Sequence, residues 1–263
     1  MRFTKMEGLG NDYIYFNCLE GVPPDLPALS ARLSNRNFGV GGDGLICIKP
    51  GRGGDFSMEM YNADGSRGSM CGNGIRCLGK YVYDKGLTRK TCLTIDTDAG
   101  PRGLELLVRR GMVDRVRVNM GRAEVLPAIL IQVGEEFFSV TQVQVGNPHG
   151  VIFCADPAAA DLAQLGPVLE HHPALRERAN IEFVSLTGED SLSVRVWERG
   201  SGITLACGTG ACACFAAARK EGLCGPRATV CLPGGALELE YIGEDIWMTG
   251  PARTVFEGEV DCS

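Results

Sequence analysis

The sequence predicts an α+β protein of two similar domains that arose by duplication within one chain. The first observation is a Cys-Gly-x-Gly tetrapeptide that occurs twice, at Cys71–Gly74 and at Cys207–Gly210. The offset is 207 − 71 = 136 residues, about half of the 263 residues in the chain. The second observation is that other stretches repeat at the same offset, which indicates a duplicated unit. The third is that each tetrapeptide follows a strand-like stretch and opens a helix-like one.

The repeated stretches lie on both sides of each tetrapeptide. They include alternating segments of the strand type before it and a Gly-Leu pair after it. The matched pieces are Gly10-Asn11 with Gly146-Asn147, Met58–Asn62 with Val194–Glu198, and Gly86-Leu87 with Gly222-Leu223. The repeat places the first domain at residues 1–117 and the second at residues 118–251.

Each tetrapeptide predicts the start of a helix. Apolar residues recur at helical spacing over 75–82 and over 211–218, and Gly86 and Gly222 end the two patterns. The second of these helices is apolar on nearly every side, so we expect it to be buried on several sides.

The other elements follow from local pattern. Residues 1–18 predict a strand and a glycine-rich turn, and residues 39–44 predict a loop that packs closely or faces a ligand. The remaining predictions are helices within 23–35 and 157–175, strands within 93–108, 115–120, 137–153 and 192–197, and a hairpin of 228–232 with 236–241.

Composition indicates a compact enzyme with a small-molecule partner. The chain has 26 basic and 32 acidic residues, a net charge of −6, and no run of like charge that would predict a nucleic-acid or membrane surface. Polar residues such as Glu7 interrupt the first 16 positions, so we expect no signal peptide, no membrane span and a cytoplasmic location.

The 12 cysteines predict neither a metal site nor a disulfide framework. No pair has C-x-x-C spacing, and Cys212 and Cys214 lie on one predicted helix without a histidine nearby. Because the chain is large and lacks a secretion signal, we expect its thiols to stay reduced.

A cysteine just ahead of a helix has a distinctive chemistry. Unpaired backbone N–H groups and the positive end of the helix dipole favour thiolate over thiol, and adjacent glycines let a carboxylate approach the backbone. A single such cysteine is more often an inert buried thiol. Two of them in a duplicated chain, Cys71 and Cys207, predict two acid/base groups that act on opposite faces of one Cα, as in a racemase or epimerase.

Long motifs in the chain resemble the diaminopimelate epimerase family, and the resemblance extends nearly end to end. The motifs are Lys5–Asp12, Asn62–Ser66, Met70–Cys77, Gly146–His149, Glu198–Gly200 and Ala206–Gly210. This resemblance implies domains in which a curved, mostly antiparallel sheet wraps one central helix. It also implies that terminal strands cross between domains, so that residues 252–263 complete the first domain.

The resemblance implies an isomerase of lysine and peptidoglycan precursor biosynthesis that interconverts LL- and meso-diaminopimelate. It also allows a homodimer. We expect no pyridoxal phosphate or other cofactor, because no lysine lies in a context typical of such a site. Donors around the substrate carboxylate would then stabilise the carbanion. The predicted donors are the N–H groups of Gly72, Asn73, Gly208 and Thr209.

The remaining predicted site residues would bind the rest of the substrate. Arg199 matches a second carboxylate. The other predicted contacts are Asn11, Asn62, Asn147, Asn180 and Glu198, with His149 and Gly44 close to the site. Some members of the family carry Gln at the position of Gly44, so that contact is absent here or comes from backbone or water.

Three alternatives remain open from the sequence. The chain could be another cofactor-independent racemase, acting on proline, hydroxyproline or histidine. It could instead be a thiol redox protein in which Cys71 and Cys207 form a switch disulfide. Glu198 and Arg199, taken alone, could form no more than a surface ion pair.

Overall fold

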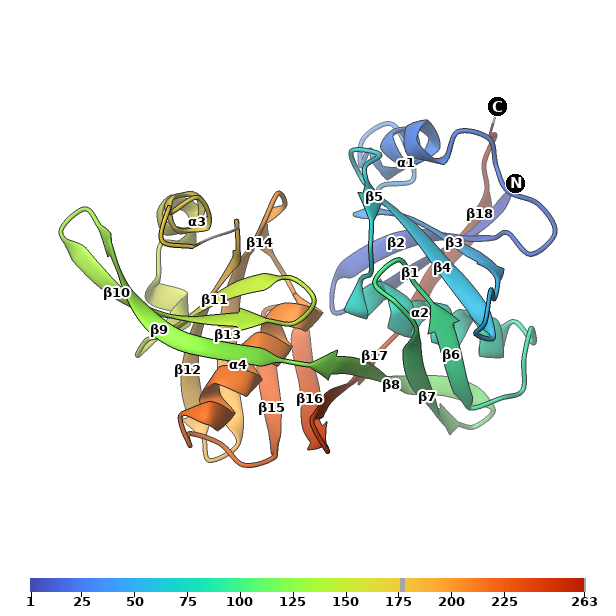
Figure 1. Cartoon of the computed structure of the whole chain (residues 1–263). Helices are drawn as coiled ribbons and strands as arrows, with labels where there is room; N and C mark the ends of the chain where they lie inside the picture. The colour runs from blue at the N-terminus through green and yellow to red at the C-terminus, as the bar shows by residue number, and fades with distance from the viewer. Residues whose placement is uncertain (176–177, 263) are drawn as a thin grey trace. The chain divides into compact units, whose positions relative to one another are not determined.

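The computed structural model describes residues 1–175 and 178–262. By its contacts the chain forms two compact units, the first comprising residues 1–118 and 250–263 and the second residues 119–249. The boundaries fall inside two strands, β8 (Met112–Arg122) and β17 (Asp245–Pro251). Each of these strands therefore begins in one unit and ends in the other (Figure 1).

The first unit is a largely antiparallel sheet with a helix against it. Its strands pair in the order β18-β1-β2-β3-β4-β6-β7-β8, with parallel pairing for β2–β3 and β4–β6 and with β5 beside β4. The other strands are β1 (Arg2–Gly8), β2 (Asn11–Asn17), β3 (Gly44–Pro50), β4 (Phe56–Asn62), β5 (Arg67–Gly68), β6 (Cys92–Asp96), β7 (Arg102–Arg109) and β18 (Arg253–Glu259). The helices are α1 (Leu26–Ser34) and α2 (Gly72–Asp84).

The second unit has the same plan. Its strands pair in the order β9-β10-β11-β12-β13-β15-β16-β17, with parallel pairing for β11–β12 and β13–β15 and with β14 beside β13. These strands are β9 (Glu124–Val133), β10 (Glu136–Gln144), β11 (Pro148–Phe153), β12 (Asn180–Gly188), β13 (Ser191–Glu198), β14 (Gly202–Thr204), β15 (Arg227–Leu232) and β16 (Gly235–Ile242). The helices are α3 (Leu162–Glu170), α4 (Gly208–Lys220) and the short η1 (Pro157–Ala159).

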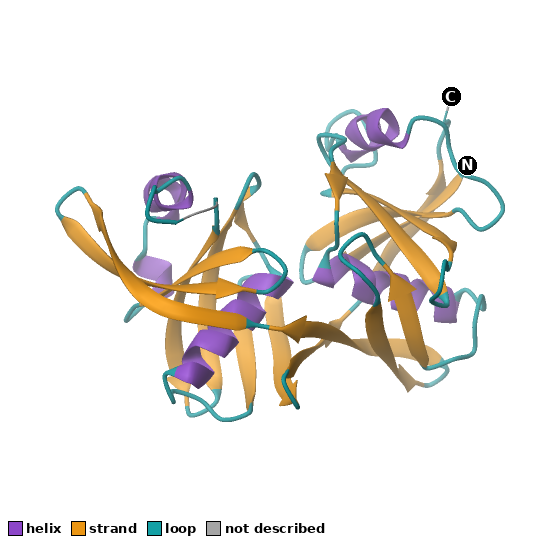
Figure 2. Ribbon diagram, viewed as in Figure 1, coloured by secondary structure: helices purple, strands orange, loops and turns teal. Residues whose placement is uncertain are grey.

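The shared strand order and the shared parallel pairs confirm the duplicated α+β fold. The pairing register keeps the sequence offset of 136, because Tyr13 lies opposite Gly44 in β2–β3 and His149 lies opposite Asn180 in β11–β12. In each unit one long helix packs against the curved sheet, α2 on strands that include β1, β2 and β7, and α4 on β9 to β13 (Figure 2).

Packing explains why these two helices form. Residues 210–218 of α4 are all buried, as the all-round apolar sequence predicts, and the alanines allow close approach of the sheet. Both helices end at a glycine in the left-handed region, Gly86 at φ 73° and Gly222 at φ 71°. The next N–H groups, of Leu87 and Leu223, bond back into the last turn, which is the usual glycine C-terminus.

Several strands fall outside the predictions, among them β3, β12 and β9. We predict no element over residues 124–133, where the structure has β9. Half of the residues of this strand are solvent-exposed, and it contains Pro127. Its conformation depends on pairing with β10, which a local pattern does not show. No helix in the described part of the chain is long and apolar enough to cross a membrane.

Candidate active site

The two cysteines of the repeated tetrapeptide occupy the same structural position. Cys71 precedes α2 in extended conformation, and its sulfur accepts the N–H of Gly74 at 3.3 Å. Cys207 precedes α4 in the same conformation, and its sulfur accepts the N–H of Gly210, also at 3.3 Å. Each sulfur therefore caps a helix N-terminus, where the backbone dipoles favour negative charge.

The last glycine of each tetrapeptide lies in close packing. A Cβ at Gly74 would lie 2.7 Å from Cδ1 of Ile46, and a Cβ at Gly210 would lie 2.6 Å from Oε1 of Glu182. In the described chain, no group accepts the N–H of Gly208 or Thr209. These two N–H groups belong to the first turn of α4, where a helix has no backbone acceptors of its own.

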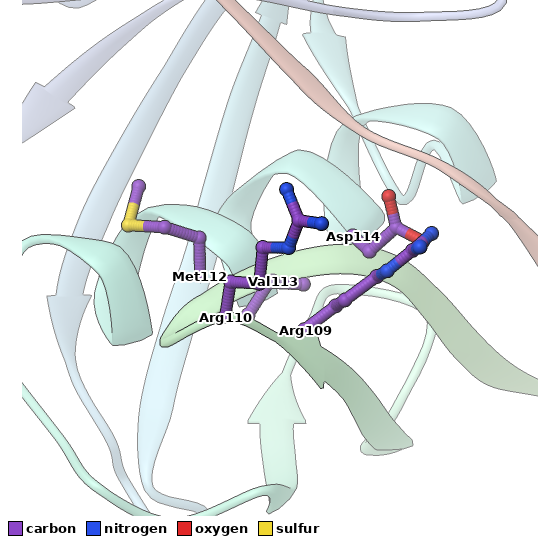
Figure 3. Close-up of a pocket in the computed structure, with 5 residues that line it drawn as sticks. All are labelled: Arg109, Arg110, Met112, Val113 and Asp114. Carbon is purple, nitrogen blue, oxygen red and sulfur yellow. The ribbon is translucent and has the colours of Figure 1, made fainter.

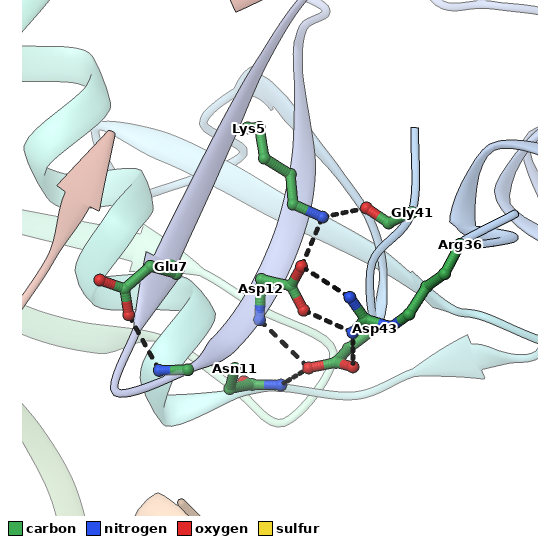
Figure 4. Close-up of polar contacts among 8 residues, drawn as sticks. Lys5, Glu7, Asn11, Asp12, Arg36, Gly41 and Asp43 are labelled. Carbon is green, nitrogen blue, oxygen red and sulfur yellow. Dashed lines mark hydrogen bonds and ion pairs between the residues drawn. The ribbon is translucent and has the colours of Figure 1, made fainter. Parts of the chain in front are cut away.

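Figure 4 shows the polar contacts around Asn11, the first residue of β2. The Cys71 thiol donates to Oδ1 of Asn11 at 3.1 Å, so the structure brings these two predicted residues together. The Asn11 nitrogen Nδ2 donates to the Asp43 carboxylate at 2.6 Å. Tyr13 lies beside them, and burial together with the neighbouring Cys71 raises the pKa of its phenol well above the ordinary value. We did not predict Asp43 or Tyr13 as site residues.

Gly44 and Asn62 lie opposite each other at one end of the β3–β4 pair. A Cβ at Gly44 would lie 2.1 Å from the carbonyl oxygen of Tyr61 and 3.0 Å from the Tyr13 ring, so this backbone admits no side chain there. The Asn62 amide donates to Ser66 Oγ at 2.9 Å, within its own turn.

The other two predicted residues of the first unit lie in the first turn of α2. Gly72 and Asn73 directly follow Cys71, and both are buried. The Asn73 side chain packs against β1, where a Cβ at Gly8 would lie 3.4 Å from its Cβ. Of the predicted side chains in this unit, the structure therefore joins Asn11 to the sulfur of Cys71, and it engages Asn62 elsewhere.

A buried polar cluster surrounds Cys207 in the second unit. His149 Nδ1 lies 2.7 Å from Glu182 Oε1, and His149 Nε2 lies 3.0 Å from Asn147 Oδ1. His149 and Glu182 are almost completely buried. Asn147 and His149 were predicted, whereas Glu182 was not. The signal for Glu182 is a lone carboxylate among the apolar residues of 181–184, all of which are buried.

The segment around Arg199 is held by neighbouring backbone and amide groups. Asn180 Oδ1 accepts the Arg199 backbone N–H at 2.8 Å, and the Arg199 guanidinium donates to the Arg178 carbonyl at 3.1 Å. Glu198 accepts a hydrogen bond from Thr204. Within the described residues Glu198 and Arg199 form no ion pair with each other, so the surface ion-pair alternative is wrong.

The acidity of Cys207 differs from the expectation. A helix start should favour thiolate, but burial raises the pKa of the Cys207 thiol well above its ordinary value, and the charges of Glu198 and Glu182 raise it further. Burial, followed by the charge of Glu182, also raises the pKa of Glu198. The hydrogen bond from Gly210 opposes the shift of Cys207 but is the smaller effect. Cys207 is therefore a thiol in this structure.

Other features offer no competing site. Among the described residues no group of three or more His, Cys, Asp or Glu side chains could hold a metal ion. A hollow of about 340 Å³ lies at the β7–β8 turn (Figure 3). It is lined by Arg109, Arg110, Met112, Val113 and Asp114, none of which is a predicted site residue. This lining contains no nucleophilic thiol or hydroxyl group.

Solved structures share the fold of this chain. The chain matches a probable proline racemase from Agrobacterium radiobacter with a TM-score of 0.78, covering 99% of this chain and 92% of the other at 18% identity. It matches a hydroxyproline epimerase from Agrobacterium vitis with a TM-score of 0.73, covering 99% and 90% at 15% identity. At these identities the likeness shows the fold alone, which this chain shares with the racemase and the epimerase.

Sequence comparison gives the family within that class. The family model "Diaminopimelate epimerase" matches residues 3–126 and 141–255. The diaminopimelate epimerase of Acetivibrio thermocellus is 45% identical, covering 99% of each chain, and that of Leptospira biflexa is 43% identical with the same coverage. The chain belongs to the diaminopimelate epimerase family. The predicted family and the predicted class of enzyme, an isomerase, are confirmed.

The raised pKa of Cys207 makes a prediction for the free protein. The absorbance of a thiolate at Cys207, read as the difference between the wild type and Cys207→Ala, should be absent at neutral pH, because the thiol stays protonated at every pH below its raised pKa. Glu198→Gln should move the transition to lower pH, since it removes the largest charge that opposes ionisation. A thiolate at Cys207 at neutral pH, or no response to Glu198→Gln, would contradict this electrostatic account.

Proposed function

We propose that this chain interconverts LL- and meso-diaminopimelate, with Cys71 and Cys207 as the two acid/base groups. The observation that carries the proposal is the same construction in both units, a cysteine sulfur held at a helix N-terminus by the N–H of the third helical residue. Family membership supplies the substrate, because the relatives at 41–45% identity carry the name diaminopimelate epimerase.

The chemistry needs a base on one face of Cα and an acid on the other. One thiolate takes the Cα proton, and the second thiol gives its own proton to the opposite face, so configuration inverts and each sulfur changes protonation state. The mechanism requires that both sulfurs reach the same Cα. Burial and the nearby carboxylates favour the thiol form of Cys207, which suits this residue to donate a proton.

The carbanion must be stabilised as it forms. Backbone N–H groups of Gly72, Asn73, Gly208 and Thr209 would bind the substrate carboxylate, which takes up part of the developing charge. Each such donor is worth about 3–4 kcal/mol of transition-state stabilisation. With this stabilisation the proposed reaction needs no cofactor.

The second amino acid head of the substrate needs its own partners. The guanidinium of Arg199 would bind the distal carboxylate, and the carboxylate of Glu198 would accept from the ammonium group. Asn62, Asn147 and Asn180 would complete the contacts directly or by positioning, as Asn180 does for the backbone of Arg199.

The proposed biological setting follows from the substrate. The reaction serves lysine and peptidoglycan precursor biosynthesis in the cytoplasm. A homodimer is the proposed assembly, and the proposal requires neither nucleic acid nor membrane as a partner.

Removing either sulfur should stop epimerisation. Cys71→Ala and Cys207→Ala should each lower kcat by about 10²- to 10⁴-fold, because one face of Cα loses its proton carrier. The assay is the interconversion of purified LL- and meso-diaminopimelate. The matched controls are Cys77→Ala in α2 and Cys212→Ala in α4, which remove buried thiols from the same helices and should change stability more than turnover.

Two results would overturn the two-base assignment. One is near-normal turnover by either single variant at Cys71 or Cys207. The other is a wild-type protein that epimerises nothing but forms a reversible Cys71–Cys207 disulfide, which would support the redox alternative.

Substrate choice tests the proposed second head-binding group. We expect turnover of LL- and meso-diaminopimelate and rejection of proline, hydroxyproline and histidine by about 10⁴-fold or more in kcat/KM, because those ligands leave the groups that bind the second head unpaired. Arg199→Met should lower kcat/KM for diaminopimelate by about 100-fold or more. Arg227→Met, which removes an exposed arginine paired with Glu240, is the control and should change little. Comparable kcat/KM for a one-headed amino acid would favour another racemase of this fold.

A further inference from the structure

The side chain of Asn11 is held in one orientation. Its Nδ2 lies 2.6 Å from Oδ2 of Asp43, and an ionised carboxylate can only accept hydrogen bonds, so the amide must turn its NH₂ group toward Asp43. The amide oxygen is thereby directed to the Cys71 sulfur, which lies 3.1 Å away and donates its thiol proton.

Asp43 is itself fixed by several donors (Figure 4). Its Oδ2 also accepts the Asp12 backbone N–H at 3.1 Å, and its Oδ1 pairs with Arg36 at 2.9 Å. The Asp43 N–H donates to the Asp12 carbonyl at 2.7 Å. The Asp12 carboxylate in turn binds Arg36 and the buried Lys5, 2.6 Å from its ammonium group. This arrangement holds the 35–43 loop and β2 in register with each other.

The second unit lacks this carboxylate. The residue that corresponds to Asp43 is Ala179, since 43 + 136 = 179. The amide that corresponds to Asn11 is Asn147, and there it is the oxygen that is engaged, 3.0 Å from Nε2 of His149. The neighbouring side chain therefore engages the NH₂ group of the amide in the first unit and the oxygen of the amide in the second unit.

We propose that Asp43 is a positioning residue for Cys71, acting through the Asn11 amide. An acceptor facing the sulfur favours thiol, whereas an amide NH₂ in the same place would favour thiolate. By fixing the amide, Asp43 sets the protonation balance of one of the two acid/base groups. The inference rests on the proposed acid/base role of Cys71 for its functional meaning, but the contact itself can be tested without substrate.

Other titratable groups lie near Cys71 and bear on the pH at which its thiol ionises. They are Tyr13 and Tyr15 of β2, Arg76 and Cys77 of α2, and Glu7 of β1 near the last two. The carboxylate that accepts from the Asn11 NH₂ group belongs to Asp43, which is not one of these groups. All the other groups are unchanged in the variants below.

The experiment measures alkylation of Cys71 by iodoacetamide as a function of pH, with modified peptides counted by mass spectrometry. Asp43→Ala should move the midpoint of alkylation to lower pH by about one unit, because the released amide can turn its NH₂ group toward the thiolate. In the Asn11→Ala background the same substitution should have a much smaller effect, since the group through which it acts is gone. Equal shifts in both backgrounds would overturn the proposal.

Asp12→Asn is the matched control. It removes one negative charge from the same network but leaves the bond between Asp43 and Asn11, so it should lower Tm without moving the Cys71 midpoint. A midpoint shift as large as that of Asp43→Ala would mean that charge alone is responsible, and would also overturn the proposal. If Asp43→Ala fails to fold, Asp43→Asn replaces it, with a smaller shift expected and no shift counting against the proposal.

Activity provides the second readout and separates this inference from the proposed function. In Asp43→Ala the limb of the kcat/KM pH profile that belongs to Cys71 should move to lower pH, as the alkylation midpoint does. If the wild-type protein does not epimerise diaminopimelate, the proposed function fails while the alkylation result still decides the role of Asp43.

Discussion

The structure depends on one interaction that occurs twice, the hydrogen bond from the third residue of a buried helix to a cysteine sulfur. The bond measures 3.3 Å in both units. It lies where the chain enters the helix and fixes the sulfur at the positive end of the helix dipole. The bond needs glycine at the donor positions, where a Cβ would meet Ile46 or Glu182. The sheet that wraps each helix thus positions the sulfur as well as forming the core.

Around this shared construction the two units differ in charge. Cys71 is half-buried and faces the neutral amide of Asn11, whereas Cys207 is buried close to the carboxylates of Glu198 and Glu182. Burial, and after it the charges of these carboxylates, raise the pKa of the Cys207 thiol. A duplicated scaffold therefore holds two sulfurs in surroundings of different charge.

The sequence predicts the features that repeat along the chain and those that depend on residues close together in the sequence. The offset of 136 predicts the duplicated fold, the two helix starts and the alignment of Gly44 with Asn180, because each leaves a pattern of glycines or apolar residues. Asp43 and Glu182 were not predicted as site residues, because the site residues that they contact, Asn11 and His149, are 32 and 33 residues away in the sequence. The raised pKa of Cys207 also differs from the prediction, because the position of the thiol at a helix start does not show how deeply the thiol is buried.

The most direct test of the two-cysteine mechanism is to follow LL-diaminopimelate in deuterium oxide early in the reaction. The account predicts meso product that carries deuterium at the inverted Cα, and remaining LL substrate that carries none, because the proton is removed by one thiolate and replaced from the other thiol. Deuterium in the recovered LL substrate at the same rate as in the product would show that one group serves both faces, and would contradict the account.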